Sequence, residues 1–175
     1  MKFFEKTITS KKIFEGKIIN VRIDEVELCN GERASREIVE HSGAVAIIPL
    51  INREKIFMVK QFRKPLDKEL LELPAGKLES GEDPKDCALR ELEEEIGYRA
   101  GSIKKLISIY TSPGFADEII HIFIAKDLVK TMTSRDQDEF MDIFEINLMD
   151  TPNMILKGEI TDAKTIAGLL TYLHR

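Results

Sequence analysis

One segment, from residue 83 to residue 97, constrains the fold more than any other part of the chain. Asp83 and Pro84 are typical of a helix start, because aspartate caps free backbone N–H groups and proline suits the first helical position. Gly97 suits the left-handed conformation that often ends a helix. Apolar residues recur every four positions between these ends, at Ala88, Leu92 and Ile96. This pattern predicts a helix from about Pro84 to Ile96 with one buried stripe.

Three glutamates lie beside this stripe, at Glu91, Glu94 and Glu95. Like charges three or four positions apart destabilise a helix by roughly a few tenths of a kcal/mol per pair. The same residues occupy the last turns, where the helix dipole also disfavours negative charge. A solvated acidic face is the usual interpretation of a Glu-rich helix. Here the apolar loop Leu73–Glu79 precedes the helix, and its Gly76 allows close backbone approach. The unfavourable placement of the glutamates and the shape of this loop both favour divalent cations bound by the carboxylate oxygens.

These residues together resemble the Nudix box. The box reads Gly, five residues, Glu, seven residues, Arg-Glu, an aliphatic residue, any residue, Glu-Glu, any residue, Gly and an aliphatic residue. The fixed positions are filled by Gly76, Glu82, Arg90, Glu91, Leu92, Glu94, Glu95 and Gly97. Tyr98 is the one departure, at a position where we expect packing. A match at this many positions is far more specific than a lone glycine motif.

The resemblance implies a metal-dependent hydrolase of diphosphate linkages. Its principal metal ligands would be Glu91 and Glu95, and Glu94 would be either a shared ligand or a residue that hydrogen-bonds to the ligands. The backbone carbonyl of Ala75 would be a further ligand. The cofactor implied is Mg²⁺, with Mn²⁺ as an alternative.

Glu82 and Arg90 would orient the ligands through hydrogen bonds and an ion pair. Arg90 also stands four positions before Glu94, so we expect it to pair with that residue on the helix as well.

Further segments resemble the ADP-ribose pyrophosphatase group within this family. Pro113 stands fifteen residues after Tyr98, in the run Thr111–Phe115. Similar segments are Arg36–His41, Gln61–Arg63, Glu69–Gly76 and Asp162–Thr165. The resemblance implies hydrolysis of ADP-ribose to AMP and ribose 5-phosphate. The alternatives are another nucleoside-diphosphate sugar, a dinucleotide or an oxidised nucleotide, or a catalytically silent nucleotide-binding module. The presence of all three box glutamates counts against a silent module.

Five residues outside the box are candidates for substrate binding: Arg63, Arg36, Glu37, Phe115 and Glu118. The guanidinium of Arg63 suits phosphate or ribose oxygens, and the alternative is a surface arginine. Phe115 either packs against a base or ribose or fills the core. Glu118 either assists the metals or is a surface acid. Arg36 and Glu37 would reach the ligand from a partner subunit.

The reaction also needs a base, because a metal-activated water must lose a proton. In the family this base often comes from a loop before a late strand, which corresponds here to Thr133–Phe140. Glu139 is our choice, and Asp138 and Asp136 remain open.

The order of the predicted elements indicates an α+β protein. The resemblance implies a Nudix-type α/β/α sandwich with a mixed β-sheet, preceded by an N-terminal antiparallel β extension. We expect the extension at residues 1–42 and the Nudix domain at residues 43–175. Alternation over Lys17–Leu28, a turn at Asn30-Gly31 and a return over Ala34–His41 predict a hairpin with little core of its own. Such strands are expected to cover another surface, for example that of a second subunit, and the resemblance implies that they build a homodimer.

The remaining elements are expected between residue 43 and the end of the chain. The predicted strands are Gly43–Leu50, Lys55–Phe62, Leu70–Leu73, Lys104–Tyr110, Ile119–Ala125 and Met141–Asn147, and the predicted later helices are Pro152–Lys157 and Asp162–Leu173.

Composition narrows the class of protein further. No apolar run approaches the roughly 20 residues of a membrane helix, and the first residues do not read as a signal peptide. The net charge of -5 gives no nucleic-acid footprint. Cys29 and Cys87 lack metal-type spacing, so we expect reduced thiols. A cytoplasmic protein with a small-molecule substrate, and with neither nucleic acid nor membrane as a partner, is the simplest interpretation.

Overall fold

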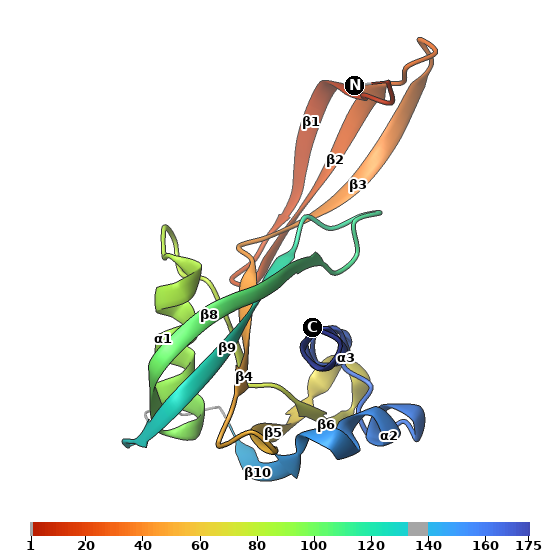
Figure 1. Ribbon diagram of the computed structural model, residues 1–175. Helices are drawn as coiled ribbons and strands as arrows, with labels where there is room; N and C mark the ends of the chain where they lie inside the picture. The colour runs from red at the N-terminus through yellow and green to blue at the C-terminus, as the bar shows by residue number, and fades with distance from the viewer. Residues whose placement is uncertain (1, 133–139) are drawn as a thin grey trace. The chain divides into compact units, whose positions relative to one another are not determined.

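Figure 1 shows the computed structural model of the chain, which describes residues 2–132 and 140–175. The chain divides into two compact units. One contains Met1–Gly43 together with Tyr110–Ile119, and the other contains Ala44–Ile109 and Ile120–Arg175.

The first unit is built on an antiparallel sheet of three strands in the order β1 (Lys6–Glu15), β2 (Ile19–Glu27) and β3 (Arg33–His41). The predicted Asn30-Gly31 turn is present, and Gly31 takes a positive φ of 86° there. Strand β1 was not predicted as a separate strand, because all ten of its residues are exposed and it therefore carries no buried-face pattern.

The segment 110–119 joins this first unit through strand β3. The N–H of Val39 donates to the carbonyl of Phe115 at 2.7 Å, and the N–H of Asp117 donates to the carbonyl of Val39 at 3.2 Å. The predicted division at residue 42 did not include this contribution from a later part of the chain.

The second unit contains two sheets. The first has the order β7 (Ala75–Lys77), β4 (Ala44–Pro49), β9 (Ile119–Lys130) and β8 (Tyr98–Tyr110). Strand β4 runs parallel to β9 and antiparallel to β7, so this sheet is mixed. The second sheet is antiparallel, with the order β10 (Met141–Asn147), β5 (Lys55–Arg63) and β6 (Lys68–Glu72). Strand β8 begins at Tyr98 rather than at the predicted Lys104, directly after the helix ends.

Helices cover both faces of the four-stranded sheet, as Figure 1 shows for α1 (Pro84–Ile96) and α3 (Ala163–Leu173). Successive side chains of β4 point to opposite faces. Val45 and Ile47 pack in a cluster with Leu92 of α1, whereas Ala46 and Ile48 pack in a cluster with Leu169 of α3. The predicted α/β/α sandwich with a mixed sheet is therefore confirmed.

Short elements complete the second unit. These are the 3₁₀ turns η1 (Lys64–Leu66) and η2 (Leu148–Asp150) and the helix α2 (Thr151–Leu156). Within the described residues, no helix has both the length and the apolar character needed to cross a membrane.

Candidate metal centre

Helix α1 has the predicted bounds and the predicted ends. The Asp83 carboxylate accepts from the Lys85 N–H at 2.8 Å, and Pro84 occupies the first helical position. Gly97 takes a left-handed φ of 72°, and its N–H donates to the carbonyl of Glu93 at 2.9 Å. Short-range chemistry at the two ends therefore fixes where the helix begins and where it ends.

Two of the box glutamates are buried. Glu91 is 8% exposed and Glu95 is 2% exposed. The Glu95 carboxylate accepts from the Ala75 N–H at 3.0 Å, which ties α1 to strand β7. Buried carboxylates are costly unless they are paired or bind metal, so these two positions, one turn apart, are not part of a solvated acidic face.

Gly76 is required by the closeness of the β7 backbone to Glu91. A Cβ atom added at position 76 would lie 1.9 Å from both Cδ and Oε1 of Glu91. No side chain fits in that space, so the absence of one at Gly76 brings the backbone against a buried carboxylate. From the sequence, the backbone at Gly76 was expected to approach whatever the carboxylates hold; in the structure it approaches the Glu91 carboxylate itself.

Arg90 connects the glutamates of the box. Its Nη1 donates to Glu91 at 2.7 Å and to Glu94 at 2.9 Å. Its Nε and Nη2 donate to the two carboxylate oxygens of Glu82 at 2.9 and 3.0 Å. Arg90 therefore makes both the helical pair with Glu94 and the longer pair with Glu82 that we expected.

These contacts shift the pKa values of the groups involved. The hydrogen bond from Arg90 lowers the pKa of Glu82 to about 2, against the opposing effect of burial. The same ion pair raises the pKa of Arg90. Burial raises the pKa of the Cys87 thiol to about 12, so Cys87 stays protonated near neutral pH and is a packing residue rather than a nucleophile.

The donor set suits a hard divalent cation, since it combines buried carboxylates with a closely packed backbone. Among residues 2–132 and 140–175, no three His, Cys, Asp or Glu side chains are grouped closely enough to hold a metal as they stand. Arg90 Nη1 binds both Glu91 and Glu94 in this arrangement. The glycine-lined approach at Gly76 and the burial of Glu91 and Glu95 fit the predicted ligand set of Glu91, Glu94, Glu95 and Ala75.

Arg63, which was predicted to bind substrate, has a protein partner that the sequence did not reveal. Its Nε and Nη2 each donate to the Glu72 carboxylate at 2.7 Å. Glu72 is 1% exposed, and Lys164 also binds it. Burial alone would raise the pKa of Glu72, but Arg63 and Lys164 together lower it. Arg63 thus neutralises a buried charge, and its contact with substrate stays a prediction.

The other predicted substrate residues belong to the first unit. Arg36 pairs with Glu5 through contacts of 2.6 and 2.9 Å, and Glu37 lies on β3. Phe115 is 57% exposed, which excludes the interpretation that it fills the core. Glu118 accepts from the Thr111 hydroxyl at 2.7 Å. The predicted base Glu139 and its alternatives Asp138 and Asp136 lie outside the described residues.

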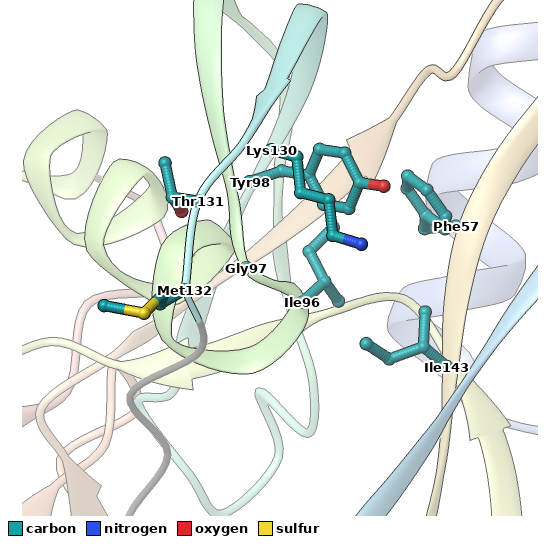
Figure 2. Close-up of a pocket in the computed structure, with 8 residues that line it drawn as sticks. All are labelled: Phe57, Ile96, Gly97, Tyr98, Lys130, Thr131, Met132 and Ile143. Atoms are coloured by element: carbon teal, nitrogen blue, oxygen red, sulfur yellow. The ribbon is translucent and has the colours of Figure 1, made fainter.

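A pocket of about 520 Å³ lies elsewhere in the second unit, beyond the C-terminal end of α1. Its lining residues, shown in Figure 2, are Phe57, Ile96, Gly97, Tyr98, Lys130, Thr131, Met132 and Ile143. The lining contains no carboxylate and none of the predicted ligands. The rings of Phe57 and Tyr98 lie 4.8 Å apart between centroids, so the one residue that departs from the box is indeed packed against the core.

Replacing Gly76 tests the close approach to Glu91. We expect Gly76→Ala to lower the free energy of unfolding by about 1–3 kcal/mol, because the new methyl group must displace Glu91 or the strand. Gly114→Ala is the matched control, since a Cβ there meets nothing within 4 Å. Urea denaturation of both variants decides the matter, and equal stability of the two would contradict the geometry described here.

Acid titration tests the pair between Arg90 and Glu82. The pKa of Glu82 lies below its ordinary value of 4.5, so the folded protein binds fewer protons than the unfolded chain. The pair therefore contributes its full stability above about pH 4.5 and loses it as pH falls toward about 2. We expect Glu82→Gln to flatten the dependence of unfolding free energy on pH over that interval. Glu145→Gln, which removes an exposed carboxylate, is the control, and identical slopes for Glu82→Gln and wild type would refute the assignment.

Comparison with known proteins places this site in a family. The family model of the NUDIX domain matches residues 40–169, and that of the nucleoside diphosphate sugar hydrolase N-terminal domain matches residues 5–39. An ADP-ribose pyrophosphatase of Bacillus subtilis (strain 168) is 51% identical, covering 97% of this chain and 92% of the relative. A methanol dehydrogenase activator of Bacillus methanolicus is 52% identical, covering 95% of this chain and 91% of the relative.

A solved structure of an ADP compounds hydrolase agrees in fold. Its TM-score is 0.86, over 97% of this chain and 92% of that one, at 19% sequence identity. At this identity the likeness concerns the fold alone. The box residues, their arrangement on α1 and β7, and the match over residues 40–169 lead to one conclusion: the chain belongs to the Nudix family.

Proposed function

We propose that this protein hydrolyses the diphosphate bond of ADP-ribose, giving AMP and ribose 5-phosphate, with Mg²⁺ as cofactor and Mn²⁺ as an alternative. The observation that carries the proposal is the pair of buried carboxylates on α1: Glu91 lies against Gly76 of the box, and Glu95 accepts from the Ala75 N–H. The relative from Bacillus subtilis, 51% identical and named an ADP-ribose pyrophosphatase, supports the choice of substrate.

In this mechanism the chain's own residues hold the metal and keep its ligands in place. Glu91, Glu95 and Glu94 would hold Mg²⁺ together with the Ala75 carbonyl. The bound metal supplies charge neutralisation of the diphosphate and a water of lowered pKa. Arg90 orients Glu91 and Glu94 through Nη1, and Glu82 fixes Arg90 from the other side. Glu82 and Arg90 thus act as positioning residues for the ligands.

The remaining roles in the reaction are proposed from the family resemblance. Glu139 would take the proton from the attacking water, with Asp138 and Asp136 as alternatives. Arg63 would contact phosphate or ribose oxygens. Phe115 is proposed to stack on a base or ribose, which its exposed ring allows. Glu118 would help to position phosphate, and Arg36 and Glu37 would act from a partner subunit.

The strongest rival is the same chemistry on another nucleoside-diphosphate sugar. The N-terminal match to a nucleoside diphosphate sugar hydrolase domain favours that wider substrate class. A silent binding module is disfavoured, because Glu91, Glu94 and Glu95 are all present and two of them are buried.

A substrate panel combined with one substitution tests the proposal. With Mg²⁺ or Mn²⁺, we expect ADP-ribose to be cleaved faster than GDP-mannose, a dinucleotide or an oxidised nucleotide, measured as phosphate released after phosphatase coupling. Glu95→Gln should lower turnover at least about 100-fold, because it removes a buried ligand charge. Glu145→Gln, an exposed change on β10, should leave turnover unchanged. Near-normal turnover of Glu95→Gln would disprove the metal assignment. Faster cleavage of another nucleoside-diphosphate sugar than of ADP-ribose would support the rival substrate class instead.

We also propose that residues 1–42 form a dimerisation extension of a cytoplasmic homodimer. Every residue of β1 is exposed, and its apolar members include Ile8, Ile13 and Phe14. An exposed edge strand with apolar side chains is a ready surface for pairing with another chain. Both cysteines are free thiols, as expected in a reducing compartment.

Sedimentation velocity measures the dimer directly. We expect wild type to sediment at twice the chain mass of 20.0 kDa, and Ile13→Arg to shift the population toward monomer because a charge would enter the interface. Leu156→Arg, on the exposed surface of α2, is the matched control and should remain dimeric. A wild-type monomer at micromolar concentration would remove the proposal.

A further inference from the structure

The start of α3 holds the loop that leads into the metal centre. We propose that Thr165, set in place by Asp162, is a positioning residue for the metal ligands: it fixes Leu73 and, through Leu73–Ala75, the Glu95 carboxylate. This inference rests on the proposed function, because it concerns the same metal. The three side chains Asp162, Lys164 and Thr165 are called the α3 latch below.

The first contact of the latch is a buried hydrogen bond. The Thr165 hydroxyl accepts from the Leu73 N–H at 2.9 Å, and both residues are fully buried. The same hydroxyl donates to the Asp162 carboxylate at 2.6 Å. A hydroxyl carries a single hydrogen, so donation to Asp162 turns its lone pairs toward Leu73. Asp162 therefore determines the direction in which Thr165 can hold the loop.

The backbone of Leu73–Ala75 connects the Thr165 contact to Glu95, and hydrogen bonds hold each of its residues. The Pro74 carbonyl, next in the chain, accepts from the Ile47 N–H of β4 at 2.9 Å. The N–H of Ala75, the following residue, donates to Glu95 at 3.0 Å. Proline has a fixed φ, so the run has little freedom to absorb a displacement at Leu73. A shift at Thr165 is therefore transmitted to Glu95.

Charge pairing holds the residue before this run. Glu72 is buried and is bound by Arg63 and by Lys164. Lys164 also lies 3.0 Å from Asp162. One turn of α3 thus holds two successive residues of the loop, Glu72 by charge and Leu73 by a hydrogen bond.

Close packing reinforces these polar contacts. A Cβ atom at Gly168 of α3 would lie 3.2 Å from a methyl carbon of Leu73. Metal ligands must be held to within about 0.5 Å of their working position, and partners outside the ligand set commonly control metal affinity. Only the three residues Leu73–Ala75 separate the contact of the latch from the contact to Glu95, so the latch is placed to control that carboxylate.

The experiment measures metal binding without turnover. Mn²⁺ binding is followed by electron paramagnetic resonance of the full-length protein in the absence of substrate. We expect Thr165→Val to weaken Mn²⁺ binding about 10-fold or more, whereas Thr165→Ser, which keeps the hydroxyl, should bind within twofold of wild type. Thr165→Ala removes the same hydroxyl without adding a methyl group, and it should weaken binding likewise.

The matched control is Thr151→Val. Thr151 is also fully buried, and its hydroxyl donates to the Leu148 carbonyl at 2.7 Å at the start of α2. A general loss of stability would therefore appear in both Thr165→Val and Thr151→Val, whereas weaker Mn²⁺ binding should appear only in the former. Circular dichroism melting of each variant confirms that the binding measurement is made on folded protein.

The outcomes separate this inference from the function on which it rests. Wild-type binding that Glu95→Gln leaves unchanged would overturn the metal centre, and the latch with it. Binding that Glu95→Gln abolishes but Thr165→Val and Thr165→Ala both leave within twofold of wild type would overturn the latch alone. Equal losses in Thr151→Val and Thr165→Val would assign Thr165 a purely structural role and would likewise overturn it.

Discussion

The burial of Glu91 and Glu95 is the constraint on which the site depends. Each carboxylate loses its hydration where the dipole of α1 is also unfavourable, so each needs a partner from the protein or a cation. Glu95 obtains the Ala75 N–H, and Glu91 obtains Arg90. The contact of Glu95 requires β7 to lie directly against the helix, and this close approach leaves no room for a side chain at Gly76 beside Glu91. The close packing of the loop on the helix and the glycine of the box are thus both linked to the burial of these carboxylates.

Arg90 compensates only part of the negative charge of the box glutamates. It binds the carboxylates of Glu82, Glu91 and Glu94, and Glu95 lies beside them on α1. Four carboxylates thus lie near the guanidinium of Arg90, and Arg63 is a further cation that interacts electrostatically with Glu95, so negative charge is in excess. Such an excess is tolerated inside a protein when cations of high charge and preference for oxygen are bound. The electrostatics of the cluster thus favour divalent metal without reference to any relative.

Features that depend on neighbouring residues could be predicted from the sequence, whereas contacts between distant parts of the chain could not. The ends of α1 depend on Asp83 and Gly97, which act within a few residues, and the spacing of the box places its glutamates on one face. Strand β1 was not predicted because all of its residues are exposed, so it has no pattern of buried positions. The pairing of Glu72 with Lys164, and of Leu73 with Thr165, spans 92 positions in the chain. The run Asp162–Thr165 was singled out by resemblance, but no local pattern reveals its partner.

The contact between Arg63 and Glu72 changes how the predicted substrate role of Arg63 must be understood. A guanidinium has two edges with hydrogen-bond donors, and Glu72 occupies the one formed by Nε and Nη2. Arg63 keeps 38% of its side chain exposed, whereas Glu72 keeps 1%. An arginine held at one edge by a buried carboxylate has already lost much of its side-chain freedom, so a ligand meeting the exposed part costs less entropy to bind. Arg63 can therefore pair with Glu72 and contact substrate at the same time, and the pairing would lower the entropy cost of the substrate contact.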